Sequence, residues 1–141
     1  KDFIHKNLYE SLNKSYLLLE GEILSKAEFF CKDKLVVAVL SQELLEKYGL
    51  DQSQTEGLVA VLKSIDGVEV SCLIKENARQ EQKISLRSKE YINVSEIAEE
   101  FGGGGHIRAA GFPLELTKEE AKEVMIKRLG DLCNEGCIDC K

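Results

Sequence analysis

The sequence predicts an α/β protein of the α+β type, with a mixed β-sheet of about five strands flanked by helices. Segments with helical spacing of apolar residues alternate with short strand-like runs, and one run, 35–40, is continuously apolar, as in a central strand. The chain of 141 residues is the size of one ordinary domain, and its 43% hydrophobic content is that of a folded protein. We therefore expect a single domain over 1–141.

The first part of the chain is expected to form a helix, a β-hairpin and a second, shorter helix. Apolar residues recur three and four positions apart over 3–26, as on one face of a helix. Residues 29–31 and 35–40 flank a short polar turn, which suggests a β-hairpin. Ser41 then suits the N-cap of a short helix, and Gly49 suits its left-handed end.

The middle of the chain is expected to hold another helix and a second hairpin. Helical spacing of leucine, valine and isoleucine predicts a helix over 55–64. Residues 68–74 alternate in the manner of a strand. A polar connection over 75–82 is expected to join this strand to a returning strand at 83–88.

Alternation within the returning strand has a functional consequence. Successive side chains of a strand point to opposite faces, so Ile84 and Leu86 share one face while Ser85 and Arg87 share the other. We expect the apolar pair to join the core. The opposite face would then present a hydroxyl and a guanidinium side by side.

The last third of the chain is expected to form a helix, a loop, a strand and a final helix. Asn93 is a suitable N-cap for a helix that Gly102 can end in a left-handed conformation. A glycine-rich loop follows, and then a strand near 111–116. Thr117 with Glu120 matches a capping box at the start of the last helix.

Charge and hydropathy exclude several classes of function. The net charge of −6 argues against a general binder of long nucleic acid, because such proteins gain affinity from many cation–phosphate contacts. A short anionic ligand held by a few cationic groups is still compatible with this charge. No apolar stretch is long enough to span a bilayer and no signal peptide pattern occurs, so we expect a cytoplasmic protein with no membrane partner.

Five cysteines are present: Cys31, Cys72, Cys133, Cys137 and Cys140. An odd number without a secretory signal favours a reducing compartment. Cys31 and Cys72 lie in apolar strand-like runs and are predicted to be buried thiols. The Cys-rich tail over 133–141 has three interpretations: a structural or incidental tail, a metal site completed by other ligands, or a redox pair.

The run 101–111 is the most informative motif, with four consecutive glycines, then His106, and Ala-Ala-Gly two residues later. Glycine loses much conformational freedom on folding, so such a run is expected where positive φ or close approach of a ligand to the backbone is needed. The N–H groups of Gly103, Gly104 and Gly105 could form an anion-binding nest. The imidazole could donate to a phosphate, transfer a proton or bind a metal, or it could simply cap backbone carbonyls.

Arg87 and Ser88 form a second candidate group. The arginine side chain is a planar fork of donors that matches phosphate, and serine adds a hydroxyl donor. The glycine motif follows across a single helix, so we expect both groups to serve one phosphate site. The alternative is that Arg87 is an exposed strand residue paired with one of the 25 acidic residues. The other histidine, His5, is expected to be solvated on the first helix.

Several common catalytic and nucleotide-binding motifs are absent from the sequence. The glycine run does not end in Gly-Lys-Ser/Thr, and it follows a helix instead of a strand, so it is neither a P-loop nor a dinucleotide-binding turn. No His-Glu-x-x-His and no Gly-x-Ser-x-Gly occurs. Nothing in the chain therefore resembles a complete hydrolytic centre.

The pattern F-G-G-G-G-H-x-x-A-A-G resembles the signature of the DHHA1 domain of DHH-family phosphoesterases. The resemblance covers roughly 20–132, and the form with four glycines is most similar to the NrnA-type branch of nano-RNases and pAp phosphatases. Four further segments look like that domain in the same order: 55–59, 64–70, 83–88 and 94–101. The resemblance implies a DHHA1-like fold.

The resemblance also implies a role for each candidate residue. His106, Arg87 and Ser88 would contact phosphate, with the loop at Thr55 and Glu56 nearby. The implied ligands are short RNA or nucleotide phosphates. No catalytic residue, metal ligand or cofactor is expected within this chain.

In the resembled family an N-terminal DHH domain holds two divalent ions, usually Mn²⁺, on aspartate and histidine side chains. No Asp-His-His triplet occurs here, so we expect a DHH domain to be an absent partner, reached through the helix 3–26. The chain alone is then expected to bind ligand weakly without turnover. Whether it forms a homodimer is left open.

Two other functions are kept as alternatives. A non-catalytic nucleic-acid-binding module, of RecJ-like or tRNA-synthetase-like type, would show affinity that grows with strand length and falls steeply with salt. A cysteine-based metal or redox protein would instead carry stoichiometric zinc or iron.

Overall fold

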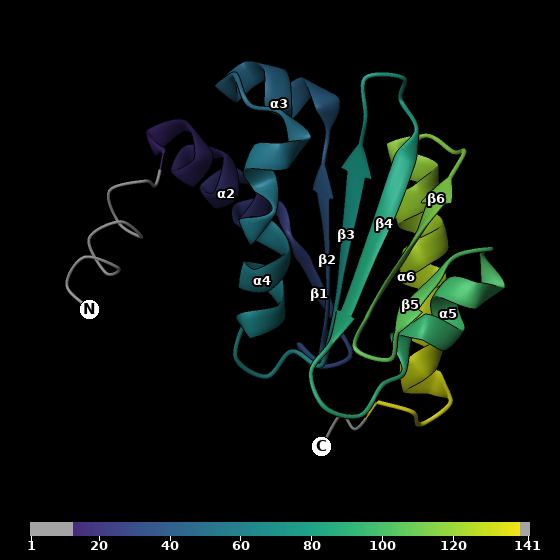
Figure 1. Ribbon diagram of the computed structural model, residues 1–141. Coiled ribbons are helices and arrows are strands. Elements are labelled where there is room, and N and C mark those ends of the chain that lie inside the picture. Colours follow the sequence, from purple (N-terminus) through teal and green to yellow (C-terminus); the bar gives the residue numbers. More distant parts are fainter. Residues whose placement is uncertain (1–12, 139–141) are drawn as a thin grey trace.

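Six strands form one mixed sheet in the order β1-β2-β3-β4-β6-β5, with helices on both of its faces (Figure 1). The computed structural model describes residues 13–138. The first part of the predicted helix 3–26, His5 and Cys140 therefore lie outside the described residues. In the described part, the helix is continuous from Lys14 to Lys26.

The elements have the following bounds: α2 Lys14–Lys26, β1 Glu28–Phe30, β2 Leu35–Leu40, α3 Gln42–Tyr48, the 3-10 helix η1 Gln52–Thr55, α4 Gly57–Ser64, β3 Val70–Glu76, β4 Gln82–Ser88, α5 Val94–Glu100, β5 Gly104–His106, β6 Ala109–Leu114 and α6 Lys118–Asn134. Strands β2 and β3 are parallel, and every other neighbouring pair is antiparallel. The mixed sheet flanked by helices confirms the predicted fold class.

Two boundaries differ from the sequence prediction in ways that matter for function. The residues Gly104–His106, predicted as a loop, form the short edge strand β5, which raises the number of strands to six. The second hairpin is also tighter than predicted, because β3 runs on to Glu76 and β4 begins at Gln82. Lys75, predicted to lie in the connection, is therefore a strand residue.

The helix boundaries follow the predicted capping chemistry. Ser41 accepts a hydrogen bond from the amide of Leu44, and Gly49 ends α3 with φ of 66°. Thr117 and Glu120 form the predicted reciprocal capping box at the start of α6. These caps fix the residues at which α3 and α6 begin and the residue at which α3 ends.

The two faces of the sheet carry separate hydrophobic cores. Alternate residues of β3 and β4, such as Cys72 and Leu86, pack with α5 and α6 in one buried cluster. A second buried cluster joins β2 and Leu73 of β3 to helices α2, α3 and α4, which lie on the other side of the sheet in Figure 1. This second cluster contains no residue of β4, β5 or β6. The face of those three strands that points away from α5 and α6 is therefore not part of a hydrophobic core.

The four consecutive glycines differ in backbone conformation and in the space around them. Gly102 ends α5 with φ of 86°. A Cβ atom on Gly103 would collide with the carbonyl oxygen of Gly111 and lie 2.5 Å from Cβ of Phe112, and one on Gly105 would lie 2.5 Å from the carbonyl oxygen of Ala109. At Gly104 a Cβ would meet no atom within 4 Å. Two of the glycines thus allow β5 to pack closely on β6, and Gly104 is the one with open space.

The loop between β4 and α5 is held by polar side chains on both sides. The carboxylate of Glu69, itself only 5% exposed, accepts hydrogen bonds from the backbone amides of Glu90, Tyr91 and Ile92. From the other side, the guanidinium of Arg108 donates to the carbonyl oxygens of Glu90 and Ile92. We call these contacts the loop clamp. It fixes the end of β4 relative to the residues that follow His106.

The cysteines differ in part from the prediction. Cys72 is fully buried, as predicted, and burial raises the pKa of its thiol. Cys31, predicted to be a buried thiol, instead forms a disulfide with Cys133 across 102 residues of sequence, with their Cα atoms 5.9 Å apart. The turn that carries Cys31 approaches the last turn of α6, which sequence spacing could not show. Cys137 is exposed and free.

Within the described range, no helix combines the length and apolar character needed to cross a bilayer.

The glycine analysis predicts a sharp difference between neighbouring positions. Gly103→Ala should lower the free energy of unfolding by more than about 2 kcal/mol, because its Cβ must displace the backbone of β6. Gly104→Ala, the matched control, should change it by less than about 1 kcal/mol, since its Cβ enters open space. Urea denaturation followed by circular dichroism measures both, and equal losses would contradict the close packing of β5 on β6.

The loop clamp predicts that Glu69→Gln is destabilising. An amide cannot accept from all three backbone N–H groups and places its own donor among them, so a loss of about 1–3 kcal/mol is expected. Glu99→Gln, on the exposed side of α5, removes the same charge and should stay within about 0.5 kcal/mol of the parent. Thermal unfolding of both variants tests this, and an unaltered midpoint for Glu69→Gln would argue against the clamp.

Candidate functional site

Arg87 and His106 lie on the same face of the sheet at the same level along the strands. Arg87 of β4 is opposite Ala109 of β6, and Ala109 is opposite His106 of β5. Residues directly opposite one another in antiparallel strands point to the same face. Two inter-strand spacings of about 4.8 Å place the Cα atoms of Arg87 and His106 roughly 10 Å apart. The two side chains thus flank Ala109.

Small residues form the floor between these side chains. Ala109, Gly111 and Gly104 share this face, with Gly104 opposite Gly111. A Cβ on Gly111 would lie 2.8 Å from the carbonyl oxygen of Ile84, so no larger residue fits there. We call this surface, which also carries Lys83 and Ser85 of β4, the Arg87 face. A ligand can approach its backbone closely.

The guanidinium of Arg87 is positioned to act on a ligand. It is half-buried, and burial lowers its pKa, although an arginine stays charged at every physiological pH. Among the described residues its side chain makes one hydrogen bond, from Nη1 to the carbonyl oxygen of Leu86 at 2.9 Å, and no ion pair with a carboxylate. The predicted alternative, an arginine paired with an acidic residue, is therefore not what the structure shows. Most of the donor fork is left for an anion.

His106 and the glycines before it do not all lie at the surface. His106 is exposed on the edge strand β5. Of the three predicted nest residues, Gly104 lies on the Arg87 face, whereas Gly103 and Gly105 are packed against β6. The predicted nest of consecutive loop amides is thus replaced by a β-strand edge.

Ser88 and Thr55 do not reach the surface. Ser88 is fully buried, and its hydroxyl donates to the carbonyl oxygen of Ile92 at 2.6 Å. Its neighbour Arg87 points to the opposite face, since consecutive strand residues alternate. Thr55 is 2% exposed and donates to the carbonyl oxygen of Gln52. In this structure both hydroxyls donate to backbone carbonyl oxygens. The hydroxyl of Ser88, predicted to contact phosphate, is therefore turned away from the surface that carries Arg87.

Glu56 is exposed between η1 and α4, and its charge acts on Lys75 of β3. It therefore lies near Lys75, one of the cationic side chains described next. A carboxylate cannot bind phosphate directly at neutral pH. The position of Glu56 is consistent with partial compensation of the positive charge of Lys75.

Two lysines of this face were missed by the sequence prediction. Lys75 and Lys83 are directly opposite each other on β3 and β4, and Lys83 shares its face with Arg87. Continuing the alternation of Ser85 and Arg87 back along β4 would have found Lys83. Lys75 was missed because the polar residues at the end of β3 favour a turn when the sequence is considered alone.

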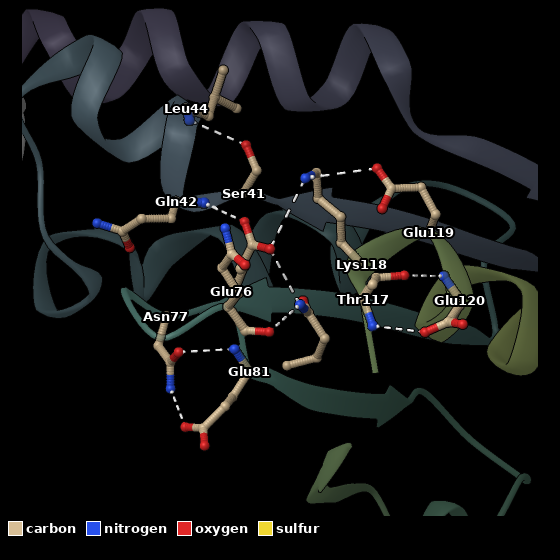
Figure 2. A network of polar contacts seen from close by, with 12 residues as sticks. Ser41, Gln42, Leu44, Glu76, Asn77, Glu81, Thr117, Lys118, Glu119 and Glu120 are labelled. Carbon is tan, nitrogen blue, oxygen red and sulfur yellow. Dashed lines mark hydrogen bonds and ion pairs between the residues drawn. The ribbon is translucent and has the colours of Figure 1, made fainter. Parts of the chain in front are cut away.

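A cavity of about 880 Å³ opens beside these lysines at the hairpin end of the Arg87 face. Its lining includes Lys75, Lys83, Gly111 and Pro113, with Gln52 and Asn77 supplying neutral polar groups. Figure 2 shows Asn77 at this end, where its side chain holds the backbone and carboxylate of Glu81. The cavity continues the floor of small residues away from His106.

No group of three or more histidine, cysteine, aspartate or glutamate side chains in residues 13–138 is arranged to hold a metal ion. The chemistry available on the Arg87 face is therefore that of cations and hydrogen-bond donors around bare backbone. Such a surface suits recognition of phosphate groups.

Two relatives of the chain bear the name of a bifunctional oligoribonuclease and PAP phosphatase. The chain is 36% identical over 73 residues to a probable bifunctional oligoribonuclease and PAP phosphatase NrnA of Streptococcus mutans, and 30% identical over 114 residues to its counterpart in Thermus thermophilus. These matches cover 52% and 80% of this chain but only 23% and 33% of the relatives, so the chain spans a third of their length or less.

Solved structures share the fold. An exopolyphosphatase-related protein from Bacteroides fragilis superposes with a TM-score of 0.83 at 32% identity, over 93% of this chain and 38% of that one. A pGpG-specific phosphodiesterase from Vibrio superposes with a TM-score of 0.57 at 19% identity, over 86% of this chain and 40% of that one, which shows likeness of fold alone.

The DHHA1 domain model matches residues 32–135, which include strands β2 to β6 and the whole glycine–histidine motif. Because that match spans most of the sequence, the chain belongs to the DHHA1 domain family.

Proposed function

We propose that this chain is the substrate-binding domain of a DHH-family phosphoesterase that hydrolyses short oligoribonucleotides, 3′-phosphoadenosine 5′-phosphate, or both. The observation that carries the proposal is the register that places Arg87 and His106 on one face across Ala109. The names of the Streptococcus and Thermus relatives support the substrate class.

In this proposal the residues of the Arg87 face bind and orient a phosphate group. The guanidinium of Arg87 donates paired hydrogen bonds to phosphate oxygens, and the imidazole of His106 donates from the other side. Gly104, Ala109 and Gly111 leave room for the phosphate to lie against the backbone. Holding the substrate in this way lowers the entropic part of the barrier to its hydrolysis.

The hydrolytic step itself is assigned to a DHH domain outside this chain. Manganese ions bound there would supply the activated water. We also propose that the protein is located in the cytoplasm. The residues of this chain contribute binding and charge neutralisation only, so the chain alone should bind nucleotide without releasing phosphate.

Replacing Arg87 with alanine should weaken binding of 3′-phosphoadenosine 5′-phosphate by about tenfold to hundredfold, as expected for loss of charge-assisted hydrogen bonds. Arg79→Ala, in the exposed hairpin, removes the same charge and should leave affinity within about twofold. Isothermal titration calorimetry on this chain measures both. Equal affinities of the two variants would remove Arg87 from the site.

A double-mutant cycle tests whether Arg87 and His106 hold the same group. If both contact one phosphate, the effects of Arg87→Ala and His106→Ala on nucleotide affinity should differ from additivity by at least about 0.5 kcal/mol. The same cycle with Arg87→Ala and Lys127→Ala, on the exposed side of α6, should be additive. Additivity of the Arg87 and His106 effects would show that the two side chains serve separate ligands or none.

A further inference from the structure

The cations of the Arg87 face form a row that is longer than the site proposed above. Arg87 and Lys83 lie four residues apart on β4, and Lys75 is opposite Lys83 on β3. At about 3.4 Å per residue, the Cα atoms of Arg87 and Lys83 are roughly 14 Å apart. Arg87 therefore stands near His106, and the two lysines stand beside the cavity at the hairpin end.

This row costs stability in the absence of a ligand. Like charges directly opposite each other on antiparallel strands repel. The pKa of Lys75 is lowered, first by burial and then by the charges of Lys83 and Arg87, and only Glu56 acts in the opposite direction. Neither lysine makes an ion pair within the described residues, although the chain has 25 acidic residues against 19 lysines and arginines. Cations that stand opposite each other without an ion-paired carboxylate form a surface that can receive an anion.

Two carboxylates at the same end of the sheet, those of Glu76 and Glu81, have other partners. Glu76 follows Lys75 in β3, so its side chain points to the other face of the sheet. There it accepts hydrogen bonds from the amide of Gln42 and the side chain of Gln82, and lies 3.9 Å from Lys118 (Figure 2). Glu81 accepts a hydrogen bond from the side chain of Asn77, also drawn in Figure 2. Neither carboxylate neutralises Lys75 or Lys83.

We propose that Lys75 and Lys83 form a second anion subsite, which holds a further phosphate of a ligand whose first phosphate lies between Arg87 and His106. The ligand class is a short oligonucleotide, because two phosphates carried by a single nucleoside, as in 3′-phosphoadenosine 5′-phosphate, lie too close together to reach from Arg87 to Lys83. The cavity beside Pro113 accommodates a nucleoside of that oligonucleotide. The inference rests on the proposed function, because it extends the same ligand along β4. It makes the two lysines determinants of ligand length.

The test compares a short and a longer ligand on this chain. The probes are 3′-phosphoadenosine 5′-phosphate, a 5′-phosphorylated triadenylate and inorganic tripolyphosphate. The variants are Lys83→Ala and, as the matched control, Lys127→Ala, which removes the same charge from the opposite side of the sheet. Lys83 is exposed, so its truncation is not expected to disturb folding.

Lys83→Ala should weaken binding of the triadenylate by about five- to tenfold and leave the affinity for 3′-phosphoadenosine 5′-phosphate within about twofold. The slope of log affinity against log salt for the triadenylate should fall in magnitude by about 0.7, the value for one phosphate contact on a single strand. Lys127→Ala should change neither. A merely structural lysine would not alter the salt slope for one ligand alone.

The outcomes separate this inference from the proposed function. If neither nucleotide ligand binds the parent chain, the proposed function fails. If both bind and Lys83→Ala weakens them equally, or weakens neither, the second subsite is overturned. A drop for tripolyphosphate without a drop for the triadenylate would also overturn it, because the subsite would then hold polyphosphate instead of nucleotides.

Discussion

The pairing of β4, β6 and β5 is the constraint on which the proposed site depends. Arg87 and His106 come from strands separated by an entire helix and turn, and only the alignment through Ala109 places them on one face. A slip of one residue would send every side chain of a strand to the opposite face. The close fit of Gly103 and Gly105 against β6 specifies this alignment, because it requires the absence of a Cβ at those positions.

The loop clamp extends that constraint to the end of β4. Ser88 and Arg108 belong to the same motifs as Arg87 and His106, yet their side chains are turned to the backbone of residues 90–92. The amide of Ser88 also donates to the carbonyl oxygen of Arg108, which ties β4 to the motif directly. Arg87 and Ser88 are consecutive residues of β4, so strand alternation turns the serine toward the loop and the arginine toward the Arg87 face. Arg108 lies in the turn between β5 and β6, two residues after His106.

Local patterns predicted the parts of the site that depend on periodicity. The alternation of Ile84 and Leu86 with Arg87 was sufficient to place the guanidinium outside the core, and the caps at Ser41 and Thr117 gave the helix starts. The strand β5 was not predictable in this way, because glycine has little preference for a strand and its pairing is imposed by β6. The contact between Cys31 and Cys133 joins the two ends of the described fold, so no local signal encodes it.

On the proposed function, the charge distribution allows an acidic chain to accept a phosphate ligand and to discriminate by length. Electrostatic interactions between exposed charges are largely screened beyond about 8 Å at physiological ionic strength. A bound phosphate would therefore interact much more strongly with the nearby cations than with the net charge of −6. The cationic row ends at Lys83, and the acidic side chains of Glu81 and Glu115 stand at the rim of the same cavity. A strand that continued past the row would bring its next phosphates toward carboxylates. On the proposed function, attraction along β4 and repulsion beyond it together favour a ligand of a few nucleotides over a long one.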